Sequence, residues 1–87
     1  MRMGQNENIV QQKSYEFALR VVRLHTYLNN EKKEYIISKQ LFRAGTSIGA
    51  NLAEAKYAQS RADFISKCHI ALKESSEASY WISLLHD

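Results

Sequence analysis

The chain of 87 residues contains no proline, only three glycines and a single cysteine. Because turns in β-rich folds usually need proline and glycine, their scarcity favours a helical protein. A single cysteine excludes an internal disulfide and fits a reducing, cytoplasmic setting. The sequence also lacks the run of roughly 18 apolar residues that a membrane span requires, and its N-terminus lacks the apolar centre of a signal peptide. We therefore expect one small all-α cytoplasmic domain.

Apolar residues recur at helical spacing over three segments, which predicts three amphipathic helices. Their expected bounds are roughly 9–28, 33–57 and 62–85. Residues 1–8 are expected to form a flexible tail before the helical domain at residues 9–87. Ser60 with Asp63 resembles a capping box at the start of the third helix. The fold class that follows is an all-α, antiparallel up-down helical bundle.

The second helix contains two glycines, each of which costs about 1 kcal/mol in a helix interior relative to alanine. The sequence allows either a break into two helices or one continuous helix with close backbone approach. Gly45, Gly49 and Ala53 recur every four residues, and the apolar stripe beside them continues without interruption. We therefore favour a continuous helix in which these three residues form a smooth groove at an oligomer interface.

The third helix carries a heptad-like seam in which apolar or small residues are spaced alternately by four and three positions. The seam consists of Phe64, Cys68, Ala71, Ser75, Ala78, Ile82 and Leu85. Ile70, Trp81 and Leu84 lie on another side of this helix, where three helices alone offer nothing to cover them. We predict that a further helix or a partner subunit covers these three residues. The last residues contain no helix stop signal, so the helical pattern is expected to have been cut off near this point.

Two polar residues of the second helix are predicted to have structural roles. Asn51 lies on the apolar stripe, where an amide must be hydrogen-bonded, and it is expected to fix helix register rather than to contact a ligand. Glu54 shares a strip with Arg43. We expect Glu54 to pair either with Arg43 of a neighbouring subunit or with Lys73.

No set of side chains predicts catalysis, a cofactor or a metal site. The three histidines are scattered, and the chain has no Glu-x-x-His pair of the kind that a di-metal bundle uses. Cys68 has no activating base nearby in the pattern, and the helical glycines are not followed by the lysine of a phosphate-binding loop. The sequence therefore predicts a protein that is not an enzyme.

Basic residues are the candidate binding feature, because the chain has a net charge of +3 and a pI near 9.1. The candidate nucleic-acid contacts are Lys13, Arg20, Arg23, Lys32, Lys33, Lys39 and Arg43. If copies of the chain form a ring, each basic strip is repeated, and several phosphates can be contacted without readout of bases. The alternative is a charged surface that serves only solubility.

Residues 41–55, which read LFRAGTSIGANLAEA, resemble the signature of a bacterial four-helix-bundle family. That family was first noticed as proteins encoded within intervening sequences of large-subunit ribosomal RNA genes. Residues 62–67 (ADFISK), 70–74 (IALKE) and 80–85 (YWISLL) resemble its third helix. Tyr15, Phe17 and Ala18 resemble the start of its first helix, so the resemblance spans roughly residues 14–85. The fourth helix of the family pattern is not present in these 87 residues.

The resemblance implies an antiparallel four-helix bundle that assembles into a ring, commonly a pentamer. It also implies kinship with the basic accessory protein of diversity-generating retroelements, which engages nucleic acid and a reverse transcriptase. It implies no catalysis, and no biochemical function is established for most members. We therefore expect a non-enzymatic, homo-oligomerising module that docks another macromolecule. The alternative is a sequence-independent RNA- or DNA-binding protein.

Overall fold

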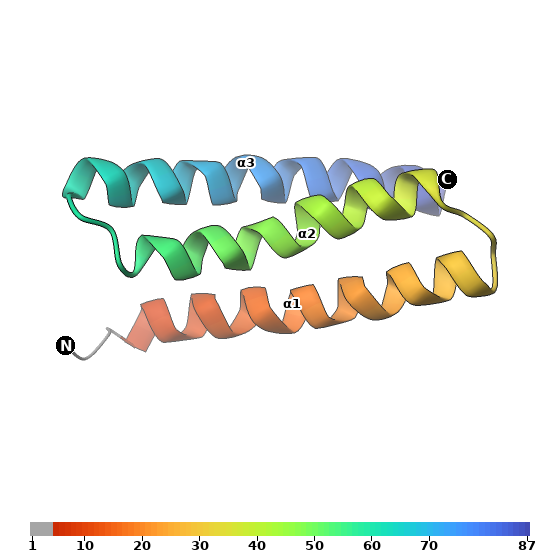
Figure 1. The fold of residues 1–87 in the computed structure, drawn as a ribbon, viewed down its shortest axis with the longest axis horizontal. Helices are drawn as coiled ribbons and strands as arrows, with labels where there is room; N and C mark the ends of the chain where they lie inside the picture. Colours follow the sequence, from red (N-terminus) through yellow and green to blue (C-terminus); the bar gives the residue numbers. More distant parts are fainter. Residues whose placement is uncertain (1–4) are drawn as a thin grey trace.

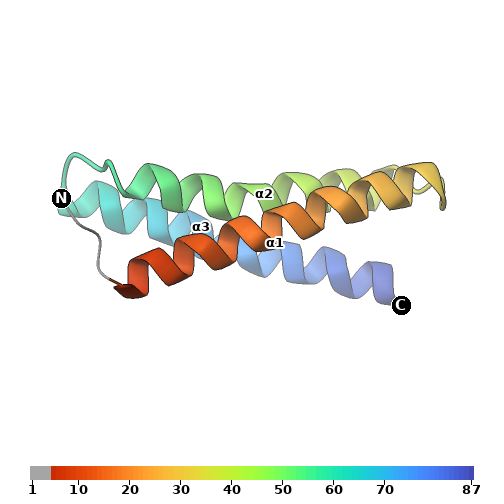
Figure 2. The same ribbon diagram turned by 90° about the horizontal axis from the view of Figure 1, so that it is seen from below.

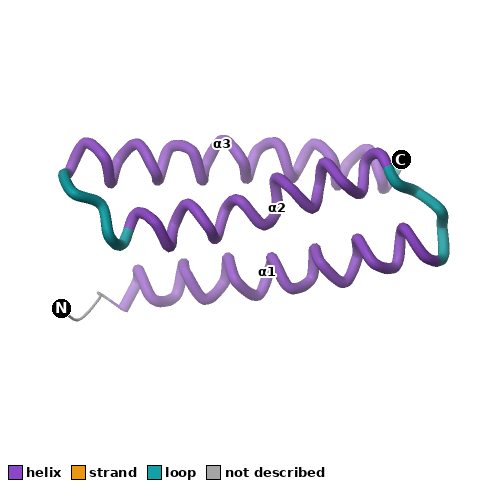
Figure 3. The backbone as a smooth tube through the Cα atoms, viewed as in Figure 1, coloured by secondary structure: helices purple, strands orange, loops and turns teal. Residues whose placement is uncertain are grey.

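The computed structural model describes residues 5–87, with side chains from Ile9 onward. The described chain contains three helices and no strand, joined by two short turns (Figure 3). The helices are α1 (Gln5–Asn30), α2 (Ile36–Ala55) and α3 (Arg61–His86). The predicted all-α class is therefore confirmed. The first helix begins at Gln5 rather than Ile9, so part of the expected tail is helical, and residues 1–4 lie outside the described residues.

The helices run antiparallel, and α2 lies between α1 and α3 (Figure 1). Seen from below, α1 and α3 cross near the middle of the molecule and separate toward both of its ends (Figure 2). Within the described residues, no Cα atom of α1 comes within 8 Å of a Cα atom of α3. The backbones of both outer helices therefore lie close to α2 and further from each other.

The α1–α2 turn explains why α2 begins later than the apolar pattern predicted. Lys33 adopts a left-handed backbone conformation with φ of 55°, which ends the helical path of α1. The Glu34 carboxylate then accepts hydrogen bonds from the backbone N–H groups of Ile36, Ile37 and Ser38, at 3.2, 3.1 and 2.7 Å. Burial acts to raise the pKa of Glu34, but these N–H donors outweigh it and lower the pKa. Glu34 thus caps the N-terminus of α2.

The start of α3 follows the predicted capping pattern. The Ser60 hydroxyl accepts a hydrogen bond from the backbone N–H of Asp63 at 3.0 Å. The Asp63 carboxylate reaches back to the backbone N–H of Gln59 at 3.4 Å. This reciprocal arrangement satisfies N–H groups that the first turn of a helix cannot satisfy by itself.

The core is small and contains few large side chains. Its buried cluster consists of Val21, Leu41, Ala44 and Ala78. Partly buried side chains that pack against this cluster are Phe17, Ile48, Trp81 and Leu85. Because all three helices contribute, this cluster joins them through α2 near the middle of the bundle.

The two glycines of α2 lie within one continuous helix, as we favoured, but their neighbour is α1 of the same chain. A Cβ atom added to Gly45 would lie 2.9 Å from Cγ2 of Val21, closer than side chains normally approach. A Cβ atom added to Gly49 would lie 3.3 Å from the Ser14 hydroxyl oxygen. Within one chain, α1 therefore occupies the groove at Gly45 and Gly49, and their part in an oligomer interface stays a prediction. Ala53, the third residue of the pattern, is exposed.

The orientation of α3 differs from the prediction. Trp81 was expected to lie uncovered, but it packs against the core cluster, and Ile70 is half-buried. Only Leu84 of this set is exposed in the chain. The predicted seam is instead divided, because Ala71 and Ala78 are buried whereas Phe64 and Ile82 are each 41% exposed. The helix is thus rotated so that Trp81 contributes to the core and part of the seam faces the open side.

Candidate functional site

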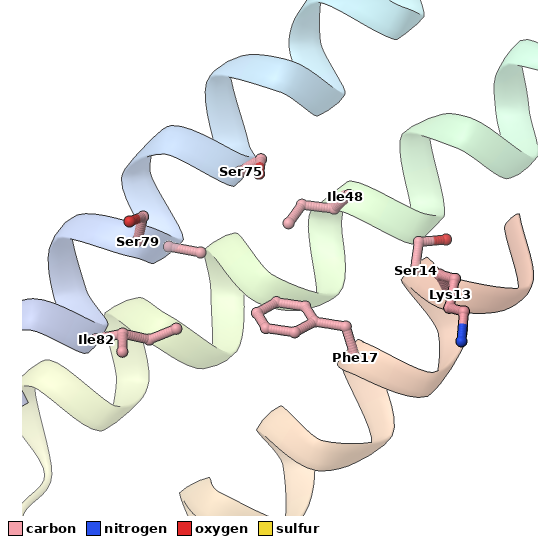
Figure 4. A pocket seen from close by; sticks show the side chains of 8 residues that line it. Lys13, Ser14, Phe17, Ile48, Ser75, Ser79 and Ile82 are labelled. Carbon is pink, nitrogen blue, oxygen red and sulfur yellow. The ribbon is translucent and has the colours of Figure 1, made fainter. Parts of the chain in front are cut away.

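An open groove runs between α1 and α3, with α2 as its floor, and encloses about 340 Å³. Its lining residues are Lys13, Ser14, Phe17, Ile48, Ser75, Ala78, Ser79 and Ile82. Figure 4 shows Phe17 pointing from α1 toward α3, with Ile48 of α2 beside it and Ile82 on the far wall. We refer to this feature as the α1/α3 groove.

The lining of the α1/α3 groove is mainly apolar. Its polar groups are serine hydroxyls and a single charged side chain, Lys13, at the α1 edge. Among its lining residues there is no carboxylate, histidine or cysteine. Such a groove is suited to accept a row of apolar side chains from another helix.

Periodicity extends both walls of the groove beyond its lining residues. Val10 and Leu24 lie seven positions before and after Phe17, on the same strip of α1, and both are exposed. On α3, Phe64 precedes Ile82 on the strip that contains Cys68 and Ser75. The exposed apolar surface therefore follows most of the length of both helices, as expected of a helix-binding groove.

The face of α3 that contacts α2 carries a polar network that the sequence analysis missed. Arg43 of α2 pairs with Glu74 at 3.3 Å and also with Glu77. The same Glu77 oxygen accepts a hydrogen bond from Nε1 of Trp81 at 2.9 Å. Glu74 and Glu77 are separated by three positions and so lie on one face of α3, which was the available signal.

Within the chain, Glu54 has a partner that the sequence did not predict. Glu54 pairs with Lys67 of α3 in the same chain, at 2.9 Å, rather than with Lys73 or a neighbouring Arg43. This hydrogen bond and the charge of Glu54 raise the pKa of Lys67. Glu54 pairs with Lys67 because the rotation of α3 places Lys67 on the side that faces α2.

Asn51 is half-buried, and its amide donates to the backbone carbonyl of Ser47 at 2.8 Å. This bond lies within α2, so it does not join two helices as the predicted register role requires. Polar links between α1 and α2 are made elsewhere, one of them by the amide of Gln11, which donates to the backbone carbonyl of Leu52 at 3.3 Å. The Ser38 hydroxyl donates to the side-chain oxygen of Asn29 at 3.0 Å, and the Asn29 amide lies 3.2 Å from Nε2 of His25.

The seven candidate nucleic-acid contacts divide into paired and unpaired residues. Arg43 is committed to the carboxylates of α3, and Lys13 has a long contact of 3.8 Å with Glu16. Among the described residues, the other five make no ion pair within 4 Å. These are Arg20, Arg23, Lys32, Lys33 and Lys39, all exposed. They lie on the second half of α1, on the turn and at the start of α2, toward one end of the bundle (Figure 1).

Metal sites and membrane-spanning helices are absent from the part of the chain that the structure describes. Residues 5–87 contain no group of three or more histidine, cysteine or acidic side chains placed to hold a metal ion. None of the three helices is both long and apolar enough to cross a membrane. Two candidate functional surfaces therefore remain. One is the α1/α3 groove, and the other, which we call the basic end, consists of Arg20, Arg23, Lys32, Lys33 and Lys39.

Comparisons with known proteins support the resemblance stated from the sequence. The sequence profile of the 23S rRNA-intervening sequence proteins matches residues 6–87. A similar crystal structure is that of a protein of unknown function from the S23 ribosomal protein family of Bacteroides thetaiotaomicron VPI-5482. It shares 59% identity with this chain over 91% of this chain and 70% of its own length, with a TM-score of 0.90. No curated protein matches the chain.

Proposed function

Because this chain belongs to the family of 23S rRNA-intervening sequence proteins, we propose that it is a non-enzymatic helical module that oligomerises and docks another macromolecule. A cytoplasmic setting is part of this proposal, since the single cysteine, Cys68, has no partner in the chain.

The observation that carries the proposal is the α1/α3 groove. Phe17, Ile48 and Ile82 expose apolar surface to a space of about 340 Å³, whereas bundles of this type normally cover such surface with a neighbouring helix. We propose that a fourth helix packs there and completes a four-helix bundle. That helix belongs to a further segment of polypeptide or to a partner chain.

A second apolar surface supports self-assembly. Tyr15, Leu19 and Val22 are exposed on the flank of α1 that faces away from the groove. A groove occupant would leave this flank uncovered, and soluble proteins seldom expose extended apolar patches without a partner. The family resemblance suggests a pentameric ring as the resulting assembly.

Solution mass measurements test this proposal. We expect the parent protein to form an oligomer at micromolar concentration, and Val22→Glu to reduce its mass because a charge would be buried at the interface. Ser76→Glu is the matched control, since it adds the same charge at an exposed position of α3 outside the groove lining. A parent protein that stays monomeric at high micromolar concentration would refute the oligomerising part.

The basic end favours a second candidate function, backbone-directed binding of RNA or DNA. Its five unpaired cations are available to phosphates, and contacts of this kind carry no base specificity. Titration of labelled RNA and DNA at increasing salt concentration tests this function. Replacing Arg23, Lys32 and Lys39 by glutamine should weaken binding. It should also reduce the slope of log affinity against log salt concentration by the amount expected for about three phosphate contacts.

The matched control for that titration replaces three cations toward the opposite end of the bundle and along α3, namely Lys56, Arg61 and Lys73, by glutamine. The two variants have the same net charge, so a difference between them reports position rather than total charge. Absence of binding by the parent protein at low salt would remove this second candidate.

A further inference from the structure

We propose that the basic end binds single-stranded nucleic acid, with unpaired bases stacked on the rings of Tyr27 and Tyr35. The cations of the basic end contact phosphates, and the two rings contact base faces that a duplex hides. This inference rests on the second candidate function and adds the form of nucleic acid that the site takes.

Each of these tyrosines lies one helical turn from a cation of the basic end. Arg23 precedes Tyr27 by four residues on α1, and Lys39 follows Tyr35 by four residues at the start of α2. The backbone of Tyr35 is already in the right-handed helical region. Residues four apart are neighbours on one helix face, about 6 Å apart along the axis. A nucleotide whose base lies on either ring can therefore place its phosphate at the adjacent cation.

The faces of both rings are accessible. Tyr27 is 49% exposed and Tyr35 is 56% exposed. Among the described residues, neither ring packs against another aromatic ring or lies beneath a cation. Neither ring belongs to the lining of the α1/α3 groove, so the two candidate surfaces use different residues. Bases can therefore approach these rings without displacing a side chain that already stacks on them.

The other exposed tyrosines lack this combination of an open ring and a nearby cation. The ammonium group of Lys56 lies 5.6 Å from the centroid of the Tyr57 ring. The Tyr80 ring packs edge-on against Trp81, with ring centroids 5.1 Å apart. Tyr15 has no basic residue three or four positions away on α1. Among the described tyrosines, open rings beside cations thus occur at the basic end.

Carboxylates near the basic end leave it positively charged. Between residues 20 and 39 the chain has five cations and two glutamates, Glu31 and Glu34. The Glu34 carboxylate accepts backbone hydrogen bonds from the start of α2, and Glu16 lies seven residues before Arg23, about 10.5 Å away along α1. Glu31 is exposed and opposes phosphate binding. We therefore expect Glu31→Gln to raise the affinity for single strands and duplexes alike.

The tyrosines favour single strands because only unpaired bases offer their faces. In a duplex each base stacks on its neighbours, so the basic end could contact phosphates alone. A duplex has the higher density of charge, and cations without stacking would bind it at least as tightly as a single strand. A preference for single strands therefore reports the tyrosines rather than the cations.

Two labelled oligonucleotides with equal numbers of phosphates test this proposal by fluorescence anisotropy with the full chain. One is a thymidine homopolymer, which stays single-stranded, and the other is a hairpin duplex. We expect the homopolymer to bind about tenfold more tightly at low salt. A uridine homopolymer should behave in the same way, because stacking on an aromatic ring does not require DNA.

Tyrosine variants locate the stacking site. Tyr27→Ala and Tyr35→Ala should each lower the affinity for the homopolymer about fivefold or more, and should leave the affinity for the hairpin within about twofold. Tyr27→Phe and Tyr35→Phe keep the ring and should bind like the parent protein. Tyr57→Ala, at the opposite end of the bundle (Figure 1), is the matched control and should change neither affinity. Circular dichroism establishes that each variant is folded.

The salt dependence separates stacking from charge. Arg23→Gln and Lys39→Gln should each reduce the slope of log affinity against log salt concentration by about 0.7 for the single strand. The tyrosine variants should lower the affinity without changing this slope. A tyrosine variant that changed the slope as much as Arg23→Gln would assign its effect to phosphate contacts and overturn the stacking.

The remaining outcomes distinguish failure of this inference from failure of the second candidate function. Equal affinities for homopolymer and hairpin, unchanged in the alanine variants, would overturn the stacking but retain backbone-directed binding. Phenylalanine variants as weak as the alanine variants, or an equal loss in Tyr57→Ala, would also overturn it. If the folded parent protein binds neither oligonucleotide at low salt, both the inference and the second candidate function fail.

Discussion

The two sides of α2 are packed by different means. Against α1, the contact depends on shape, because Gly45 and Gly49 allow Val21 and Ser14 to approach the backbone of α2 closely. Against α3, charged residues contribute much of the specificity, with Arg43 and Glu54 both paired across the interface. The comparison shows that a single helix can specify two neighbours independently, since close approach and ion pairing use different faces of it.

This difference also explains the signature segment at residues 41–55. Its glycines face α1, its arginine and glutamate pair with α3, and Leu41 and Ala44 are buried between the outer helices. The segment thus satisfies the packing requirements of a central helix. We expect substitutions on the α1 side to be more damaging than those on the α3 side, because a close-packed contact has no room for added atoms whereas an exposed ion pair contributes little.

Gly45→Leu should have the largest effect, lowering the free energy of unfolding by about 3 kcal/mol, because Val21 has a stiff side chain and cannot move aside freely. Urea denaturation measures this change. Gly49→Leu should be somewhat milder, since its nearest neighbour is the hydroxyl of Ser14 at 3.3 Å. Ala50→Leu, on the exposed face of α2, is the control and should change stability by less than about 0.5 kcal/mol. A Gly45→Leu protein as stable as the parent would show that the approach of α1 is not limiting.

Trp81→Ala should have the next largest effect, lowering the free energy of unfolding by about 2–3 kcal/mol. The indole is only half-buried, so the effect should fall toward the lower end for aromatic truncations in cores. Thermal and urea denaturation test it. Trp81→Phe retains most of the packing and removes the hydrogen bond to Glu77, so the difference between the two variants separates packing from polar contacts. Two equal losses would mean that the hydrogen bond, not the ring, carries the effect.

Glu34→Gln should lower stability by about 1 kcal/mol at neutral pH, because a neutral amide is a weaker acceptor for the N–H groups at the start of α2. The folded pKa of Glu34 lies below its ordinary value of 4.5. Its contribution is therefore fully present above that value and is lost as pH falls through the folded pKa. Urea midpoints measured from neutral pH to about pH 3 should decrease more for the parent than for Glu34→Gln. Parallel curves would exclude Glu34 as a titrating cap.

Arg43→Met should cost about 1 kcal/mol or less, since the Arg43 side chain is half exposed and screened by solvent. The methionine preserves much of the side-chain packing and removes the charge. A double-mutant cycle with Glu74→Gln measures the coupling, which should weaken at high salt. If Arg43→Met proved as destabilising as Gly45→Leu, the contrast between the two sides of α2 would not hold.

Lys33→Gly should have the smallest effect and the opposite sign, stabilising the protein by about 0.5 kcal/mol. Glycine adopts a positive φ without the steric penalty of a side chain, although it loses more backbone entropy on folding. Lys32→Gly removes the same charge from a neighbouring position without positive φ and should not stabilise. Equal stability changes in these two variants would assign the effect to charge rather than to backbone strain.

The helices and their caps were predictable because their signals are local. Apolar spacing located all three helices, and the Ser60–Asp63 cap was recognised from four consecutive residues. The late start of α2 at Ile36 was not predicted, because Glu34 fell within the expected helix at 33–57. In the structure Glu34 precedes the helix and accepts hydrogen bonds from its first N–H groups. Such a cap becomes visible only when the turn geometry is known.

The rotation of α3 was the main error, and its cause lies in the sequence of that helix. Trp81 and Ile82 are adjacent and point to different sides, so apolar periodicity fits more than one strip. Distant pairs decide between them, including Arg43 with Glu74 and Glu54 with Lys67, and one sequence does not reveal which distant residues meet. The uncovered side of the bundle was expected, but its residues were misassigned for the same reason.

The wide backbone separation of α1 and α3 also bears on how the native state opens. We expect either outer helix to open locally with a free energy below that of global unfolding. Amide hydrogen exchange should then be slowest in α2, which is released only when both neighbours have left. Because the close backbone approaches among the described residues join helices that are consecutive in the chain, folding should also be fast, with each hairpin forming from nearby residues.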